Sequence, residues 1–385
     1  MPRSKLPTQT RRAAVRPAFS TALPATILLG LALLMAGCNE QPSVGQTAGT
    51  SAPQSAQTLI FPGTGAYTGA YIDFGDTEDA VLLEAIEKFE TLVGKHQAVI
   101  ASSSFWGQQG FPRKNIELIS RHGSIPLIFW SPWDKPYLEN RPPDRFSLHN
   151  ILAGKWDNYI DMWADEARAY GKPLLVSWGL EMNGSWFPWS GVHYADSQPS
   201  GPNQSQSAAG PELYKKAYRY VVGRARARGA RQVLWIFHVN NRSFPIASWN
   251  SIAQYYPGAD VVDLLGLSVY GKLFSDAAWV SLPEAMDSAY QELCRLDPQK
   301  PLIVAEWGAG EFPGSGDKSA WLTEAFAALK TRYPRVKAAV YWHERWQNQN
   351  ETHSNLRVNS SPEALSAYRQ GIADHYWHGS LLDSR

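Results

Sequence analysis

Short apolar runs alternate with amphipathic stretches along most of this chain. From about residue 58 onward the alternation occurs eight times. Buried strands of a parallel sheet have this pattern, because helices cover both of their faces. The apolar runs comprise residues 70–74, 97–103, 125–130, 173–181, 232–238, 262–270, 301–307 and 337–343. Eight such strands in alternation with helices predict an α/β fold of the (β/α)8 TIM-barrel type.

A doubly wound open sheet is the alternative arrangement for the same alternation. Such a sheet binds nucleotides through a glycine-rich turn after its first strand. The sequence has no such turn after residues 70–74, which weakens this alternative. The helices after the second and fifth apolar runs are the least distinct part of the pattern. We therefore expect one barrel domain, the catalytic one, over residues 58–385, and no cofactor.

The first 57 residues differ from the rest of the chain. Basic residues up to Arg16 precede an apolar run that ends in Leu-Met-Ala-Gly-Cys at Cys38. The run is short for a membrane-spanning helix, and its end resembles the lipobox of bacterial lipoproteins. This resemblance implies a signal peptide over residues 1–37 and a lipid on Cys38, with an ordinary secretory signal as the alternative. Residues 38–57 are rich in Ser, Gln, Thr, Gly, Ala and Pro, and we expect a flexible tether there.

Charge and composition limit the partners of the chain. The formal net charge is +1, whereas nucleic-acid-binding proteins carry a basic excess, so we expect no nucleic acid partner. The nine histidines show no metal-ligand spacing and there are only two cysteines, so we expect no metal centre. No feature calls for more than a monomer. A lipid on Cys38 implies the membrane as a partner and a place in the cell envelope, on the periplasmic or the outer-membrane and extracellular side.

Two acidic residues end apolar runs, where an ionisable side chain is costly unless it is paired or used. Glu181 ends the fourth run and Glu306 lies near the end of the seventh. In a barrel the carboxyl ends of all strands meet at one mouth, where active sites lie. Two carboxylates at such a mouth are what glycoside hydrolysis requires. Buried ion pairs are the alternative role for each of them.

The segments around both acids resemble one enzyme family. Leu-Glu-Met-Asn-Gly-Ser-Trp at residues 180–186 resembles the acid/base motif of glycoside hydrolase family 26, and Val-Ala-Glu-Trp-Gly at residues 304–308 resembles its nucleophile strand. The resemblance implies a (β/α)8 barrel and a retaining double displacement. It assigns the acid/base to Glu181 and the nucleophile to Glu306. One position departs from the family motif, because Leu180 stands where the family usually has histidine.

The same resemblance implies roles for three aromatic residues. Trp186 corresponds to a tryptophan that lines the cleft, and Tyr270 to a tyrosine that hydrogen-bonds the nucleophile. Trp342 corresponds to an aromatic floor beneath the sugar at the cleavage point. With sixteen tryptophans and seventeen tyrosines in the chain, either a large aromatic core or surfaces that stack on sugar rings can account for the composition.

Further candidates follow from position alone. Four residues at or near strand ends are candidate substrate-binding groups, each with a packing or turn-shaping role as its alternative; they are Asp73, Trp130, Asn183 and His238. Glu311 and Glu344 are alternative acids if Glu306 proves structural.

Two functions fit these observations. The first is an endo-acting, retaining β-glycosidase that cleaves a plant or microbial β-linked polysaccharide such as β-mannan or mixed-linkage β-glucan. The second is a catalytically silent lipoprotein that binds polysaccharide on the same barrel, for example in the handling of exopolysaccharide. The sequence leaves open the sugar backbone, the linkage, and the choice between hydrolysis and transglycosylation.

Overall fold

The computed structural model describes residues 59–134, 144–194, 209–348 and 352–382. The signal peptide, Cys38 and the tether expected from the sequence lie outside these ranges. Among the residues that the structure describes, no helix is both long enough and apolar enough to cross a membrane.

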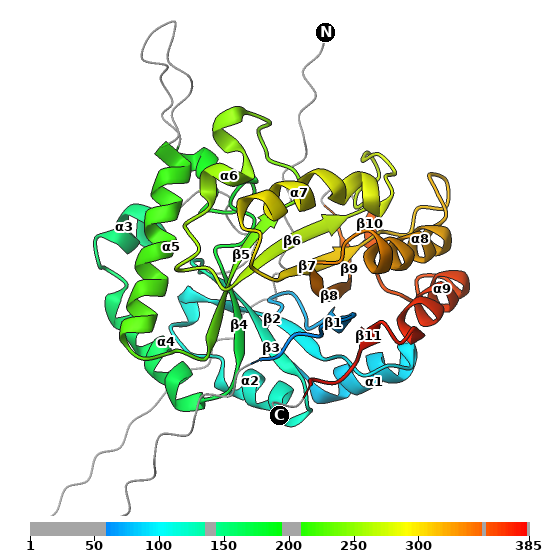
Figure 1. Ribbon diagram of the computed structural model, residues 1–385, viewed down its shortest axis with the longest axis horizontal. Coiled ribbons are helices and arrows are strands. Elements are labelled where there is room, and N and C mark those ends of the chain that lie inside the picture. The colour runs from blue at the N-terminus through cyan, green and yellow to red at the C-terminus, as the bar shows by residue number, and fades with distance from the viewer. Residues whose placement is uncertain (1–58, 135–143, 195–208, 349–351, 383–385) are drawn as a thin grey trace, which may run out of the picture. The chain divides into compact units, whose positions relative to one another are not determined.

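Eight parallel strands close into a barrel, which confirms the predicted (β/α)8 fold (Figure 1). Each strand pairs with its neighbours in chain order, and β1 pairs with β8 through contacts that include Tyr71 opposite Trp342. The strands are β1 Ala66–Ile72, β2 Val99–Phe105, β3 Ile125–Ser131, β4 Leu174–Trp178, β5 Val233–Asn240, β6 Leu264–Tyr270, β7 Leu302–Gly308 and β8 Val336–His343. Because all eight run the same way, their carboxyl ends surround one mouth.

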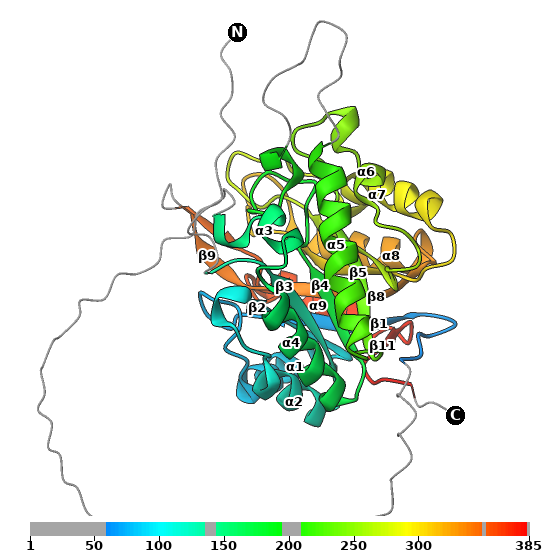
Figure 2. The same cartoon turned by 90° about the vertical axis from the view of Figure 1, so that its left-hand side faces the viewer.

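Helices cover the outside of the barrel. They are α1 Leu83–Val93, α2 Arg113–Arg121, α3 Leu148–Leu152, α4 Asp157–Tyr170, α5 Ala209–Ala227, α6 Ile252–Tyr255, α7 Leu282–Leu296, α8 Lys318–Thr331 and α9 Pro362–Ala373. Figure 2 shows the long helix α5 beside α4 on one side of the barrel. Short elements fill the connections: η1 Trp106–Gln108, η2 Asp144–Phe146, η3 Gly191–Tyr194, η4 Ser248–Asn250, β9 Arg345–Gln347, β10 His353–Asn355 and β11 Trp377–His378.

Helix ends fall at residues suited to them. Ser281 precedes α7, where its hydroxyl accepts a hydrogen bond from the backbone N–H of Glu284 and the Glu284 carboxylate accepts one from the backbone N–H of Ser281. This reciprocal pair satisfies two donors that the first turn of a helix leaves free. Gly94 ends α1 with φ of 74°, in the left-handed region that glycine adopts without strain.

Two details of the predicted pattern are corrected by the structure. The fourth strand ends at Trp178 rather than at residue 181, because Gly179 has φ of 57° and starts a turn. The amphipathic stretch after the first apolar run predicts a helix with Thr77 as its N-cap, but the helix begins only at Leu83. The fifth connection was indistinct for a physical reason, since α6 has four residues and follows a 3-10 turn.

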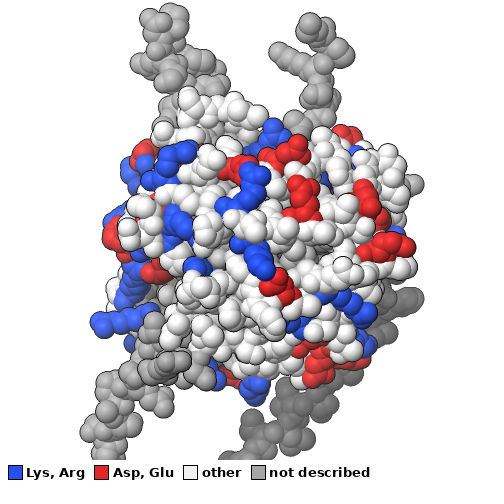
Figure 3. All heavy atoms as spheres, turned by 45° about the vertical axis from the view of Figure 1, so that its right-hand side comes forward, with Lys and Arg blue, Asp and Glu red and all other residues white. Residues whose placement is uncertain are grey.

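Most of the tryptophan is core. Thirteen of the sixteen tryptophans are buried, and seven of them are less than 2% exposed, namely Trp106, Trp130, Trp163, Trp178, Trp189, Trp235 and Trp307. Trp130 of β3 stacks on Trp163 of α4 with ring centroids 4.2 Å apart, which joins that helix to the barrel wall. The outer surface is of mixed charge, and acidic and basic side chains are interspersed on the face that Figure 3 shows.

Candidate active site

A large cavity opens at the carboxyl ends of the strands. Its volume of about 1340 Å³ exceeds the roughly 300–1,000 Å³ of sites for single small molecules, so it has room for several sugar rings. Both acids singled out from the sequence line this cavity, together with Trp186, Tyr270 and Trp342. The structure therefore brings together the five residues that the family resemblance assigned to the reaction.

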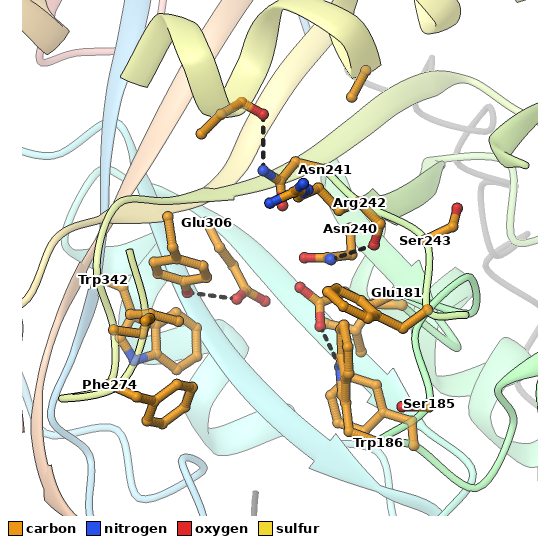
Figure 4. A pocket seen from close by; sticks show the side chains of 18 of the residues that line it. Glu181, Ser185, Trp186, Asn240, Asn241, Arg242, Ser243, Phe274, Glu306 and Trp342 are labelled. Carbon is orange, nitrogen blue, oxygen red and sulfur yellow. Dashed lines mark hydrogen bonds between the residues drawn. The ribbon is translucent and has the colours of Figure 1, made fainter. Parts of the chain in front are cut away.

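Glu181 lies three residues beyond the end of β4, in a strained turn. Its φ of 53° is unusual for a residue with a side chain. Two backbone hydrogen bonds hold this conformation: the Glu181 N–H donates to the carbonyl of His238 (2.8 Å), and the Glu181 carbonyl accepts from the N–H of Gly184 (2.9 Å). The turn directs the carboxyl group into the cavity (Figure 4).

Burial determines the acidity of Glu181. Only 7% of the residue is exposed, and this loss of solvent raises the pKa of its carboxyl group. Hydrogen bonds from the Ser268 hydroxyl and the Trp186 indole oppose the rise, because both stabilise the charged form. The indole Nε1–H donates to Oε2 over 2.6 Å. A raised pKa suits a group that must hold a proton until a leaving oxygen takes it.

Glu306 is part of β7 itself and faces Glu181. It is also 7% exposed, and the phenol of Tyr270 donates a hydrogen bond to its Oε2 over 2.7 Å. The pairing of β7 with both neighbouring strands is irregular next to this residue. The register shifts at Leu267/Ser268 in the pairing with β6, and between Val304 and Trp307 in the pairing with β8. Such irregularities re-aim side chains beside active sites. Figure 4 shows the two carboxyl groups directed toward the same central space.

Trp342 of β8 forms an aromatic wall of the cavity. One face of its ring stacks on Tyr71, with centroids 3.9 Å apart and an angle of 17° between the planes. Its Nε1–H donates to the carboxylate of Glu344 over 2.7 Å. Glu344, an alternative acid in the sequence analysis, thus holds the tryptophan in place. Glu311, the other alternative, accepts a hydrogen bond from Ser360 and lies outside the cavity lining.

His238 is connected to Glu181 instead of lining the cavity. Its Nδ1 is 3.0 Å from the hydroxyl of Ser177, and its Nε2 is 2.8 Å from that of Ser268. Burial lowers the pKa of His238 to about 3, so the imidazole is neutral. Because the Ser268 hydroxyl donates to Glu181, it accepts from Nε2–H, and Nδ1 then accepts from Ser177. His238, which the sequence proposes as a substrate-binding residue, is buried within this chain of hydrogen bonds and outside the cavity lining.

Three other residues predicted to bind substrate also lie away from the cavity lining. Trp130 is buried against α4, where its Nε1–H donates to a tyrosine hydroxyl. Asp73 forms an ion pair with Arg357 at 2.7 Å. The side-chain amide of Asn183 accepts a hydrogen bond from the backbone N–H of Asn240 over 2.9 Å and donates one to its carbonyl over 2.8 Å, which joins the loop after β4 to the end of β5. All three therefore have protein partners in the structure, namely a tyrosine, an arginine and the backbone of a neighbouring strand.

The sequence of this chain is similar to one protein family and to several characterised enzymes. The model of glycosyl hydrolase family 26 matches residues 146–361, which is more than half of the chain and includes both cavity glutamates. The chain belongs to glycosyl hydrolase family 26. Endoglucanase H of Acetivibrio thermocellus is 31% identical over 322 residues, which are 83% of this chain and 31% of that protein. A mannan endo-1,4-beta-mannosidase of Bacillus subtilis is 32% identical over 245 residues, which are 63% of this chain and 58% of the relative.

Solved structures of family 26 share the fold. The modular endo-beta-1,4-mannanase from Cellulomonas fimi superposes with a TM-score of 0.57 at 18% identity, covering 83% of this chain and 74% of that one. GH26C from Muricauda gives a TM-score of 0.58 at 14% identity, with 82% and 87% covered. The chain spans about a third of endoglucanase H and a little over half of the mannosidase.

Leu180, which stands where the family 26 motif has a histidine, lies at the cavity in the structure. Its side chain lines the cavity directly beside Glu181, while its carbonyl accepts a hydrogen bond from Trp189 over 2.6 Å. An apolar surface therefore stands where the motif has a histidine. A substrate hydroxyl at this place finds no hydrogen-bond partner in the leucine side chain.

Glu78 is a cavity residue that the sequence analysis missed. It lies in the loop after β1 with φ of 57°, it is buried, and its Oε2 accepts a hydrogen bond from the Ser103 hydroxyl over 3.0 Å. The sequence signal was ambiguous, because Glu78 stands in a stretch that reads as the start of a helix. The loop after β5 was missed too, although it places Arg242 on the cavity wall. Charged side chains in both places can bind hydroxyl groups of a sugar.

Proposed function

We propose that this family 26 chain is an endo-acting, retaining β-glycoside hydrolase of a β-linked polysaccharide. The observation that carries the proposal is the pair of buried carboxyl groups, Glu181 and Glu306, directed toward one another in a cavity large enough for several sugar rings. Their surroundings differ, as two distinct roles require. Glu181 has a pKa raised by burial, whereas Glu306 is held by a phenol that can stabilise its negative charge.

The first step forms a bond to the enzyme. Glu181 donates its proton to the glycosidic oxygen while the carboxylate of Glu306 attacks the anomeric carbon from the opposite face. The bond from that carbon to the glycosidic oxygen breaks, the leaving chain departs as an alcohol, and a glycosyl ester of Glu306 remains. The hydrogen bond from Tyr270 orients the carboxylate before the attack.

The second step releases the sugar. Glu181, now a carboxylate, takes a proton from water as the water oxygen attacks the anomeric carbon. The ester bond breaks, which restores the carboxylate of Glu306 and the protonated form of Glu181. Two inversions leave the product with the β configuration of the substrate. The Trp186 indole can only donate a hydrogen bond, so it orients the Glu181 carboxyl group in both protonation states.

The relatives narrow the proposed substrate class. The names of the two similar proteins, an endoglucanase and a mannan endo-1,4-beta-mannosidase, describe cleavage inside glucan chains and inside β-1,4-linked mannan chains. We propose a backbone of this kind, with mixed-linkage β-glucan and β-mannan as the first substrates to test. The apolar side chain of Leu180 beside the acid removes one hydrogen bond from the cleavage site and favours a sugar that does not depend on it.

A silent polysaccharide-binding protein remains the second candidate, because Leu180 replaces a histidine of the motif. A panel of β-mannan, mixed-linkage β-glucan, β-1,3-xylan and a bacterial exopolysaccharide separates the two. New reducing ends with a wide range of product sizes support an endo-acting hydrolase, and NMR of the first product should show the β anomer. Binding without new reducing ends, or a first product of α configuration, contradicts the proposal.

Removing the hydroxyl of Ser268 should change the pH dependence of the reaction. Glu181 must be protonated for the first step, so its pKa sets the basic limb of kcat/KM. The Ser268 hydrogen bond stabilises the charged form and lowers this pKa. In Ser268→Ala the pKa of Glu181 rises, and the basic limb moves to higher pH. A profile of kcat/KM against pH measures the shift.

Ser102→Ala is the matched control for this variant. Ser102 is also a buried serine of the barrel, and the structure shows no hydrogen bond of its hydroxyl within the described part of the chain. Its profile should coincide with that of the wild type. A basic limb that stays in place in Ser268→Ala, or that moves equally in both variants, contradicts the role of Ser268.

We further propose that the protein is held at a membrane of the cell envelope through a lipid on Cys38. The support is the lipobox-like segment in the sequence. Replacing Cys38 with alanine should move the protein from the membrane fraction to the soluble fraction, since the anchor would be lost. Fractionation of cells and radiolabelled palmitate incorporation measure this, with Cys294→Ala as the control; unchanged membrane association of Cys38→Ala would speak against the anchor.

A further inference from the structure

Three side chains with metal-binding atoms meet at the end of the barrel opposite the cavity. Glu90 is in the last turn of α1, His96 precedes β2, and His122 follows α2 just before β3. One ligand atom from each lies within 4.8 Å of the others. The spacing of six and twenty-six residues along the chain matches no metal-binding motif, so the sequence alone predicts no metal site here.

The geometry of this cluster, hereafter the Glu90 cluster, is close to a coordination sphere. Glu90 Oε1 is 2.8 Å from His96 Nδ1, and Glu90 Oε2 is 3.0 Å from His122 Nε2. Zinc bonds of about 2.0–2.1 Å at tetrahedral angles place ligand atoms about 3.3 Å apart. The two distances from Glu90 are shorter than this spacing by a few tenths of an ångström and involve different carboxylate oxygens. One ligand atom from each of the three groups lies within 4.8 Å of the others, so small shifts of the side chains admit the ion.

The surroundings of Glu90 also favour a cation. Only 14% of its side chain is exposed, and within the described ranges no lysine or arginine forms an ion pair with it. The side chains that contact its carboxylate are the two imidazoles. The backbone N–H of Gln97 donates to Glu90 Oε1 over 2.9 Å and orients the carboxylate, as outer hydrogen bonds do in metal sites.

We propose that Glu90, His96 and His122 bind one divalent transition-metal ion, for which Zn²⁺ is the best match. Two imidazole nitrogens and a carboxylate oxygen form a ligand set that zinc accepts, with water completing the sphere because the side chains of both histidines are partly exposed, 31% and 14%. The ion joins the end of α1 and the chain just before β2 to the chain before β3, which lies twenty-six residues further along. Its role is structural, since this end of the barrel lies away from the catalytic carboxylates.

The test uses the protein without a polyhistidine tag, stripped of metal by a chelator. Titration with Zn²⁺ followed by calorimetry should show one ion bound per chain. Zinc at about 100 times its Kd should raise Tm by about 5 °C relative to the chelated protein, because only the folded state holds the three ligands together. Absence of stoichiometric binding, or a Tm that zinc leaves unchanged, contradicts the proposal.

Glutamine variants distinguish a metal site from a hydrogen-bonded cluster. His96→Gln and His122→Gln keep a donor for Glu90 but lose the imidazole ligand. We expect each to weaken zinc binding by at least the roughly 10–100-fold typical of losing an outer partner. Their Tm in chelator should stay close to that of the wild type, so a failure to fold is detected separately. His375→Ala, an exposed histidine elsewhere, is the control and should bind zinc as the wild type does.

If the glutamine variants bind zinc with unchanged affinity, the ion is bound elsewhere and the assignment is wrong. Hydrolysis rates are not part of this test, so its failure would leave the proposed glycosidase function untouched.

Discussion

Replacing Glu306 with alanine should lower kcat/KM on the polysaccharide by about 10⁴-fold or more. The variant has no group that can form the glycosyl ester, and loss of a nucleophile removes most of the rate enhancement of a covalent mechanism. The hydrogen bond from the Tyr270 phenol also loses its acceptor. Initial rates of reducing-end release give the ratio of kcat/KM between the wild type and the variant. Tm recorded on the same preparation shows that the variant is folded.

Glu311→Ala is the matched control for this prediction. Glu311 follows the same strand and is one of the two alternative acids suggested by the sequence, but it lies outside the cavity lining. Its kcat/KM should stay within a few-fold of the wild type. Azide supplied to Glu306→Ala should restore some turnover and yield an α-glycosyl azide, because one inversion replaces two. Wild-type rates in Glu306→Ala, or a larger loss in Glu311→Ala, would remove Glu306 from the mechanism.

Replacing Glu181 with alanine should have an effect that depends on the leaving group. On polysaccharide the leaving oxygen needs a proton, and we expect kcat/KM to fall by about 10²–10⁴-fold. An aryl glycoside with an acidic phenol departs without protonation, so its glycosylation step should be affected far less. Slow deacylation then makes the glycosyl enzyme accumulate, which appears as a burst of phenol release.

The diagnostic quantity for Glu181 is the decrease in kcat/KM on polysaccharide divided by the decrease on the aryl glycoside. Azide should accelerate the second step of Glu181→Ala and yield a β-glycosyl azide, opposite in configuration to the product expected from the Glu306 variant. Glu181→Gln, which keeps the shape of the side chain, should behave in the same way. Equal losses on polysaccharide and aryl glycoside would mean that Glu181 is not the general acid.

The fold was predictable because the alternation of apolar runs and amphipathic stretches is repeated eight times in the sequence. Each apolar run is a buried strand whose two faces are both covered, and eight repetitions leave few arrangements other than a closed barrel. The limits of single elements were less predictable. The fourth run continues in apolar and small residues past Trp178, and only the positive φ of Gly179 shows that the strand has ended.

The placement of the two acids at the mouth was predictable for a similar reason, whereas the residues that surround them were not. A carboxylate after an apolar run is costly, so Glu181 and Glu306 were conspicuous in the sequence. Asp73 and His238 stand at comparable places, yet Asp73 pairs with Arg357 and His238 is part of a hydrogen-bond chain. The hydrogen-bond partner of a polar side chain comes from neighbouring elements that are distant in the chain, so the local sequence does not reveal it.

The sequence by itself determined the barrel, the placement of two acids at its mouth and the resemblance to one family, because hydrophobic periodicity and short motifs are local properties. Only the tertiary structure decided which groups surround those acids. The raised pKa of Glu181 comes from burial by several strands and from Ser268, which is eighty-seven positions away in the chain. Glu78 and the Glu90 cluster likewise depend on contacts between distant segments, since their ligand and hydrogen-bond partners come together only when the barrel closes.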